Sequence, residues 1–177
     1  MAENKEVDVN EQIKNRMEKL SALQAEGNDP FEITKYDVTC HTSDIKDNFD
    51  EMDGKDVSIA GRLMAKRVMG KASFANVADR NGNIQLYVSK DDLGDEGYKA
   101  FKKFDIGDIV GVKGRVFKTQ KGEISVHVTK IILLVKSLQV LPEKYHGLKD
   151  TDQRYRQRYV DLIVNPEVRT TFEKRSA

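Results

Sequence analysis

The sequence predicts a mainly β fold with flanking helices, in which five strands close into a small barrel preceded by an N-terminal amphipathic helix. Three observations predict it. Apolar residues recur at helical spacing near the N-terminus, runs of alternating apolar and polar residues fill the middle, and Asn81-Gly82 supplies a hairpin signal between two of these runs. With 177 residues, 38% of them hydrophobic, the chain can hold one well-packed domain with appendages.

The first predicted helix covers residues 8–26. Asp8 and Glu11 are placed as a capping box, and Gly27 is placed to end the helix. A second, short helix is expected after Ser43. The apolar positions that give the first helix its amphipathic character are Val9, Ile13, Met17, Leu20 and Leu23.

Strand character begins at Val57, and Gly61 is expected to mark a bulge or a sharp bend in this strand. Asn81-Gly82 then joins the second and third strands as a hairpin. The remaining expected elements are strands at about 71–78 and 84–88, a helix between 91 and 107, and strands at about 109–118 and 124–134. The order β-β-β-α-β-β, with a glycine-bent first strand, is that of an OB-fold, a five-stranded Greek-key barrel.

Composition excludes several classes of site. Lys and Arg total 30 against 29 Asp and Glu, so whole-chain charge indicates no polyanionic partner. Cys40 is the sole cysteine, and its spacing to the histidines His41, His127 and His146 matches no familiar metal site, so we expect no metal. The polar N-terminus and the lack of an apolar run of roughly 20 residues predict a cytoplasmic protein without membrane contact.

Local charge is more informative than total charge. Two stretches, residues 57–78 and 109–122, contain no acidic residue, whereas ordinary solvated strand faces would carry interspersed acids. In an OB-fold these stretches flank the ligand-binding face, so their cations are candidate contacts to phosphates. These cations are Arg62, Lys66, Arg67, Lys71, Lys113, Arg115, Lys118 and Lys121.

Alternation in the second and third strands predicts which side chains face outward. If Ala75 and Val77 fill the barrel, Phe74 lies outside it, and the same argument places Gln85 outside in the next strand. An outward aromatic ring beside an amide is suited to single-stranded RNA, since a base stacks on the ring and the amide bonds to its edge. The alternative, in which Phe74 is an ordinary core residue, stays open at this point.

Longer motifs carry a resemblance to a known family. The run GRLMAKRVMGKASFANVADRNGNIQLYV resembles the anticodon-binding domain of class IIb aminoacyl-tRNA synthetases, and its details are similar to the lysyl-tRNA synthetases. Further matches are FKKFDIGDIVGVKGRVFKTQKGEISV, LPEKYHGLKDTDQRYRQRYVDLIVN and the helix that contains RMEKL, so the resemblance covers nearly the whole chain.

The resemblance implies four anticodon-binding residues. Phe74 would stack on the central uridine of a UUU anticodon, and Arg67 and Gln85 would hydrogen-bond to it. Glu123 is either a turn residue or an acceptor for a neighbouring uridine. Simple alternation from Leu63 points Lys66 outward and Arg67 inward, contrary to the family spacing, and a bulge near Gly61 or a frayed strand end would reconcile the two.

The resemblance also implies a parent enzyme, a homodimeric lysine–tRNA ligase that uses ATP and Mg²⁺ and binds tRNA-Lys. The catalytic motifs two and three are missing here, so we expect RNA binding without catalysis and no cofactor in this fragment. The expected regions are a helical extension at 1–54, an OB-fold domain at 55–140, a linker and hinge helix at 141–164, and the start of the catalytic domain, cut short within motif one, at 165–177.

Two other hypotheses remain. A fragment of an aspartyl- or asparaginyl-tRNA synthetase would share the Phe and Gln readers, but the long N-terminal helix and the HGL linker argue against it. A stand-alone OB-fold module that binds single-stranded nucleic acid without specificity would need no segment resembling motif one.

Overall fold

The computed structural model describes residues 2–142, 148 and 150–176, and the chain divides into two compact units, Met1–Gln139 and Val140–Ala177. We describe each unit by itself. The greater part of the HGL linker, residues 146 and 147, lies outside the described residues, as do residues 143–145 and 149 of the expected linker.

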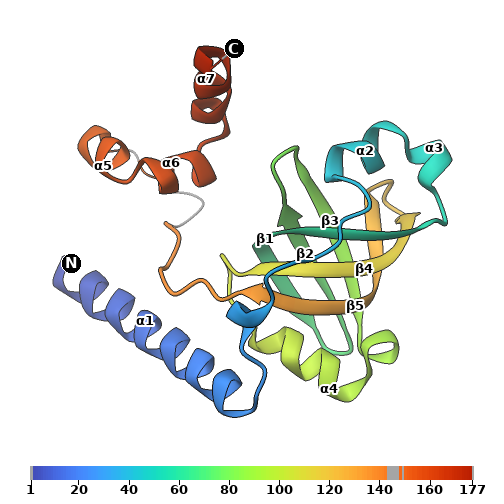
Figure 1. The fold of residues 1–177 in the computed structure, drawn as a ribbon, viewed down its shortest axis with the longest axis horizontal. Coiled ribbons are helices and arrows are strands. Elements are labelled where there is room, and N and C mark those ends of the chain that lie inside the picture. Colours follow the sequence, from blue (N-terminus) through green and yellow to red (C-terminus); the bar gives the residue numbers. More distant parts are fainter. Residues whose placement is uncertain (1, 143–147, 149, 177) are drawn as a thin grey trace. The chain divides into compact units, whose positions relative to one another are not determined.

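The first unit is built around a closed five-stranded barrel with the order β1-β2-β3-β5-β4 (Figure 1). Neighbouring strands are antiparallel except for β3 and β5, which are parallel. The predicted OB-fold topology is therefore confirmed. The strands are β1 (Asp56–Met69), β2 (Ala72–Ala78), β3 (Asn83–Ser89), β4 (Ile109–Lys118) and β5 (Ile124–Val135).

The barrel interior is filled by the alternate residues that the pattern predicted. Ile84, Leu86 and Val88 are fully buried, as are Val110 and Val112 on β4. The helix α4 (Lys90–Lys103) follows β3 and adds the buried ring of Phe101 to this core. Figure 1 shows α4 on the opposite side of the barrel from the short helices α2 (Thr42–Asp47) and α3 (Phe49–Met52).

Strand β1 pairs with β4 through its first half and with β2 through its second half. Its bulge lies at Met64, where the register with β2 shifts between Leu63 and Ala65, three residues after the Gly61 at which a bulge or sharp bend was expected. Gly61 has another role: a Cβ atom there would lie 2.5 Å from Val77 Cγ1 and 2.6 Å from the Ala78 carbonyl oxygen. Only glycine lets β1 cross so close to β2.

The β2–β3 hairpin was predicted correctly, but its turn is held by a different device. Neither Asn81 nor Gly82 has a positive φ, so the turn is not of the type that favours Asn-Gly. Instead the Asp79 carboxylate accepts hydrogen bonds from the backbone N–H groups of Asn81 and Gly82. It also accepts from the backbone N–H and the hydroxyl of Thr42, and so joins the turn to α2.

The N-terminal helix α1 (Ala2–Ala25) is longer than predicted, so Asp8 lies within the helix and is not its N-cap. Its C-terminus is at the expected place, since Gly27 has a φ of 72°. The 3₁₀ helix η1 (Pro30–Glu32) follows. Val9 and Met17 on the predicted apolar face are 41% and 50% exposed, so this face is only partly covered within the described residues.

Charged side chains, several of them buried, attach α1 to the barrel. Arg16 donates hydrogen bonds to the carbonyl oxygens of Ile106, Ser137 and Gln139, and Lys19 lies 2.6 Å from Asp105. Lys136, only 2% exposed, lies 2.5 Å from Asp105 and 2.8 Å from the fully buried Asp108. We call these five residues the anchor cluster: Arg16, Lys19, Asp105, Asp108 and Lys136.

The second unit contains three helices, α5 (Thr151–Arg156), α6 (Arg158–Val164) and α7 (Pro166–Ser176). The helix expected over 152–164 is broken at Gln157. Asp161 is fully buried and binds Arg154, Arg158 and Asn165. Burial tends to raise the pKa of Asp161, but the hydrogen bonds from Asn165 and Arg154 and the charges of both arginines more than offset it and leave the pKa below its usual value.

Candidate nucleic-acid interface

An open groove crosses the outer face of β1, β2 and β3 and continues to the loop between β4 and β5. It has a volume of 1040 Å³. The side chains that define it come from all five strands and that loop. The larger or charged ones among them are Lys66, Arg67, Met69, Phe74, Asn76, Gln85, Tyr87, Phe117, Lys121, Glu123 and His127.

The bulge at Met64 decides which basic residue of β1 shares a face with Phe74. Beyond the bulge, Lys66 lies opposite the buried Ala75, whereas Arg67 lies opposite Phe74. Because directly opposed residues share a face of the sheet, Arg67 is on the groove side. Alternation counted from Leu63 gave the wrong face for both residues, because the bulge inserts one residue into the count.

Lys66 is bound to the end of α4. Its Nζ atom donates hydrogen bonds to the carbonyl oxygens of Lys102 and Phe104, and it lies 5.6 Å from the centre of the Phe101 ring. Burial lowers the pKa of Lys66, although the nearby charge of Asp105 opposes this shift. Lys66 therefore contributes its stem to the groove wall and its ammonium group to the C-terminus of the helix.

Phe74 and Gln85 face outward as predicted. Ala75 and Val77 on β2 are buried, whereas Phe74 is half-buried on the groove side. Phe74 lies opposite Tyr87, with ring centres 5.4 Å apart, and Asn76 lies opposite Gln85. One wall of the groove thus carries two aromatic rings next to two amides.

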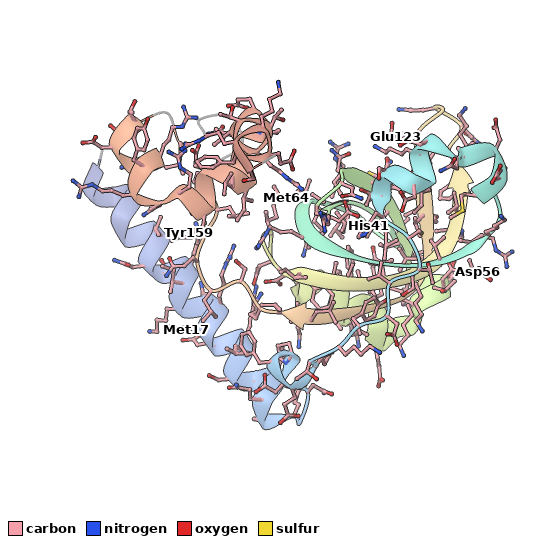
Figure 2. The ribbon with its side chains drawn as sticks, turned by 45° about the horizontal axis from the view of Figure 1, so that its top comes forward. Met17, His41, Asp56, Met64, Glu123 and Tyr159 are labelled. Carbon is pink, nitrogen blue, oxygen red and sulfur yellow. The ribbon has the colours of Figure 1, made fainter. Side chains whose placement is uncertain are left out.

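Glu123 lies in the β4–β5 loop, as Figure 2 shows. Hydrogen bonds between Glu123 and Thr119 determine the shape of this loop. The Glu123 backbone N–H donates to the Thr119 hydroxyl at 3.0 Å, and the Thr119 N–H donates to the Glu123 carbonyl at 2.9 Å. Glu123 therefore closes a turn through its backbone while its exposed carboxylate borders the groove. Both readings of this residue, as a turn residue and as an acceptor, are compatible with this geometry.

Of the remaining predicted phosphate contacts, Lys121 lines the groove and five other cations do not. Arg62 donates to the Gly107 carbonyl, Arg115 pairs with Asp56 at 3.4 Å, and Lys118 lies over the Phe49 ring at 5.6 Å. Lys113 lies opposite Ser58 and Lys130 on β1 and β5, and Lys71 lies in the exposed β1–β2 turn. Their role as phosphate contacts remains a prediction.

Three further aromatic side chains line the groove, Tyr87, Phe117 and His127, and sequence reasoning did not assign them to the site. Their ring centres lie 5.1 to 6.2 Å apart. Parity placed Tyr87 outward beside Gln85, and the same parity on β4 and β5 would have found the other two. That the three rings lie together could not be predicted from the sequence, because it depends on the parallel pairing of β3 with β5.

Two other features were searched for in the described residues. No group of three His, Cys, Asp or Glu side chains lies close enough to hold a metal ion there. No helix in that part of the chain has the length and apolar character needed to cross a bilayer.

The geometry defines a barrel with a basic, aromatic groove on one face, and comparison with known proteins agrees. Residues 57–134 match the family described as OB-fold nucleic acid binding domain. This part of the chain is therefore similar to OB-fold nucleic acid binding domains, in agreement with the closed five-stranded barrel of the structure.

The particular relatives are lysine–tRNA ligases. The chain is 56% identical to the lysine–tRNA ligase of Clostridium tetani over 173 residues, which cover 98% of this chain and 34% of the relative. It is 54% identical to that of Clostridium novyi over 177 residues, 100% of this chain and 35% of the relative. The figures for Clostridium acetobutylicum are 56% over 172 residues, 97% and 33%. The chain thus spans about a third of the length of its lysine–tRNA ligase relatives, and is related to them over nearly all of its own length.

Proposed function

We propose that the groove binds the anticodon loop of tRNA-Lys, as the recognition part of a lysine–tRNA ligase. The observation that carries this proposal is the bulge at Met64, which brings Arg67 onto the same face as Phe74 and Gln85. The names of the relatives support the choice of RNA and favour the lysyl type over the aspartyl and asparaginyl types.

Within the groove, a nucleobase stacks on Phe74, and the Gln85 amide and the Arg67 guanidinium bind its edge. Base–aromatic stacking is worth roughly 1–3 kcal/mol per base and is insensitive to sequence. Discrimination must therefore come from the hydrogen-bonding groups, and an amide can offer a uracil both a donor and an acceptor. The positive charges of Arg67 and Lys121 attract the phosphates on either side.

The lysine–tRNA ligase relatives are about three times as long as this chain. We propose that the enzyme to which the groove belongs is a cytoplasmic homodimer that activates lysine with ATP and Mg²⁺ and transfers it to tRNA-Lys. In this proposal ATP and Mg²⁺ bind to the catalytic part of that enzyme. This chain contributes recognition and no chemical step.

The test is binding of two anticodon stem-loops, one with UUU and one with the central uridine changed to cytidine, at fixed salt. The wild type is expected to prefer UUU, and Gln85→Ala to reduce that preference by roughly 3–10-fold, the worth of about one hydrogen bond. Asn81→Ala, in the β2–β3 turn and outside the groove, is the control. Equal binding of both loops by the wild type would favour a nonspecific OB-fold module.

A further inference from the structure

One row of neighbouring residues runs across the groove face through five strands. Arg67 on β1 lies opposite Phe74 on β2, and Phe74 lies opposite Tyr87 on β3. Tyr87 is aligned with His127 on β5, and His127 lies opposite Arg115 on β4. The row therefore continues three strands past the ring that the proposed function assigns to the central uridine.

Beyond Phe74 the row becomes a cluster of three rings. The imidazole of His127 lies 5.1 Å from the Tyr87 ring and 5.8 Å from the Phe117 ring, centre to centre. The Tyr87 and His127 rings are almost perpendicular, at 86°. Edge-to-face packing of this kind is favourable and fixes the plane of each ring. His127 is therefore held on two sides, while its side chain remains 40% exposed.

A carboxylate binds one of the two ring nitrogens of His127 and leaves the other for a ligand. The Nε2 atom lies 2.7 Å from Asp92 Oδ2, and Asp92 in turn accepts a hydrogen bond from the Ser89 hydroxyl at the start of α4. These bonds from Ser89 and His127 hold the pKa of Asp92 below its usual range, so it is an acceptor only. In the neutral ring, Nε2 therefore carries the hydrogen and Nδ1 carries a lone pair. No described residue hydrogen-bonds to Nδ1.

We propose that His127 is a second RNA-recognition residue, positioned by Asp92, whose Nδ1 atom accepts a hydrogen bond from the nucleotide next to the one stacked on Phe74. This inference rests on the proposed function. Phe74 and His127 are two strands apart, and two strand spacings amount to roughly 10 Å, too far for one base to contact both. The groove volume of 1040 Å³ also exceeds that of most single small-ligand pockets, roughly 300–1,000 Å³.

The chemistry of Nδ1 restricts what can bind there. A neutral imidazole nitrogen with a lone pair recognises a hydrogen-bond donor, and the phosphate oxygens of RNA are acceptors. Two donors are available in a uridine next to the central one, the N3–H of the base and the ribose 2′-OH. Both have the same chemistry toward His127, and modified RNAs separate them.

The chain contains a second His–Asp pair that serves as a matched control. His41 Nδ1 lies 3.3 Å from Asp79, but His41 does not line the groove. Replacing either histidine by phenylalanine keeps a ring of similar size and removes its nitrogens.

The experiment uses the full chain with a UUU anticodon stem-loop and two sets of modified loops. In one set each nucleotide beside the central uridine carries 2′-deoxyribose, and in the other each carries N3-methyluracil. We expect His127→Phe to weaken binding of the unmodified loop roughly 3–10-fold, and His41→Phe to leave it unchanged. One of the two modifications should weaken RNA binding by the wild type by a similar factor. The same modification should cause no further loss of affinity in His127→Phe.

Asp92 is tested through the same coupling. Asp92→Asn keeps an oxygen that can accept from Nε2 and should retain the response to the sensitive modification, whereas Asp92→Ala should lose it. A purely structural role for Asp92 would lower affinity for all loops by one factor. Thermal unfolding of each variant confirms that the protein compared is folded.

The outcomes separate this inference from the proposed function. If the wild type prefers the central uridine but His127→Phe loses the same affinity on every loop, the inference is overturned and the proposed function stands. If the wild type shows no preference for the central uridine, the inference and the proposed function are both overturned. Coupling of His127 to one modification, with the central preference retained, supports both.

Discussion

The groove and the anchor cluster lie on the same barrel and use the same kinds of charged side chain in opposite ways. In the anchor cluster each lysine ammonium lies within 2.8 Å of a carboxylate, and Arg16 donates hydrogen bonds to three carbonyl oxygens. In the groove, no described residue hydrogen-bonds to the side chains of Arg67, Gln85 or Lys121. Charges that are paired and buried hold the fold together, and polar groups left open beside exposed rings are available to a ligand.

This difference explains why net charge was a poor guide to function. The two acid-free stretches of sequence contain eight cations, but the structure assigns several of them to structural partners, such as Arg62 to Gly107 and Lys66 to the end of α4. A cation is a candidate contact for RNA when it lines the groove and has no partner among the described residues. The predictions below test this distinction.

The largest effect is expected in the anchor cluster, for Lys136→Met. This change removes the cation from between two carboxylates, one of them fully buried, and breaking a buried ion pair in this way costs about 3–5 kcal/mol of unfolding free energy. Urea denaturation measures it. Lys130→Met, on the exposed side of the same strand, is the control and should cost less than about 0.5 kcal/mol. Equal costs for the two variants would show that the cluster does not stabilise the fold.

A smaller loss is expected at Asp79, which joins the β2–β3 turn to α2 outside both regions compared. Asp79→Ala leaves the N–H and hydroxyl of the buried Thr42 without their acceptor, at a cost of about 2–3 kcal/mol. RNA affinity should not change, because Asp79 does not line the groove. A large loss of affinity in a folded Asp79→Ala protein would contradict this separation.

The same residue gives a pH dependence. Burial tends to raise the pKa of Asp79, but hydrogen bonds from Thr42, Asn81 and Gly82 more than offset it, so the pKa in the folded protein is lowered. A group with a lowered folded pKa contributes stability that is present above its unfolded pKa and is lost as pH falls through the folded one. The stability difference between wild type and Asp79→Asn should therefore be constant near neutral pH and shrink below about pH 4.

The smallest effect is expected for single cations on RNA binding, and it sharpens the comparison most. Arg67→Ala should reduce the slope of log affinity against log salt by about 0.7, the value for one contact to a single strand. Lys113→Ala should leave the slope unchanged, because Lys113 does not line the groove. If Lys113→Ala changed the slope as much as Arg67→Ala, the sequence-based assignment of both as phosphate contacts would be right and the groove would be too narrow a definition of the site.

Much of the barrel could be predicted, because one face of each strand is buried. Ile84, Leu86 and Val88 must share one face, and this places Gln85 and Tyr87 on the other without any knowledge of the fold. The β4 strand was found in the same way, whereas the helix between β3 and β4 was found from apolar residues that recur every three to five positions.

The errors occur where one residue breaks the local rule. The bulge at Met64 reverses which side chains face outward in the rest of β1. The residue types of Leu63-Met64-Ala65 do not indicate a bulge. The break at Gln157 likewise has no proline or glycine to mark it. Long-range partners are the other gap: Lys19 with Asp105, and His127 with Asp92, are brought together by the fold alone.

The central claim is that Phe74 is a stacking platform for the central uridine, and Phe31 offers a matched comparison. Phe31 is 47% exposed in the 3₁₀ helix η1 and does not line the groove. The measurement is the affinity of wild type, Phe74→Ala and Phe31→Ala for the UUU stem-loop and for a loop with an abasic central nucleotide. We predict that Phe74→Ala loses roughly 1–3 kcal/mol on the UUU loop and nothing further on the abasic loop, while Phe31→Ala matches the wild type on both. Equal affinities of Phe74→Ala and wild type for the UUU loop, at the same salt, would contradict the account.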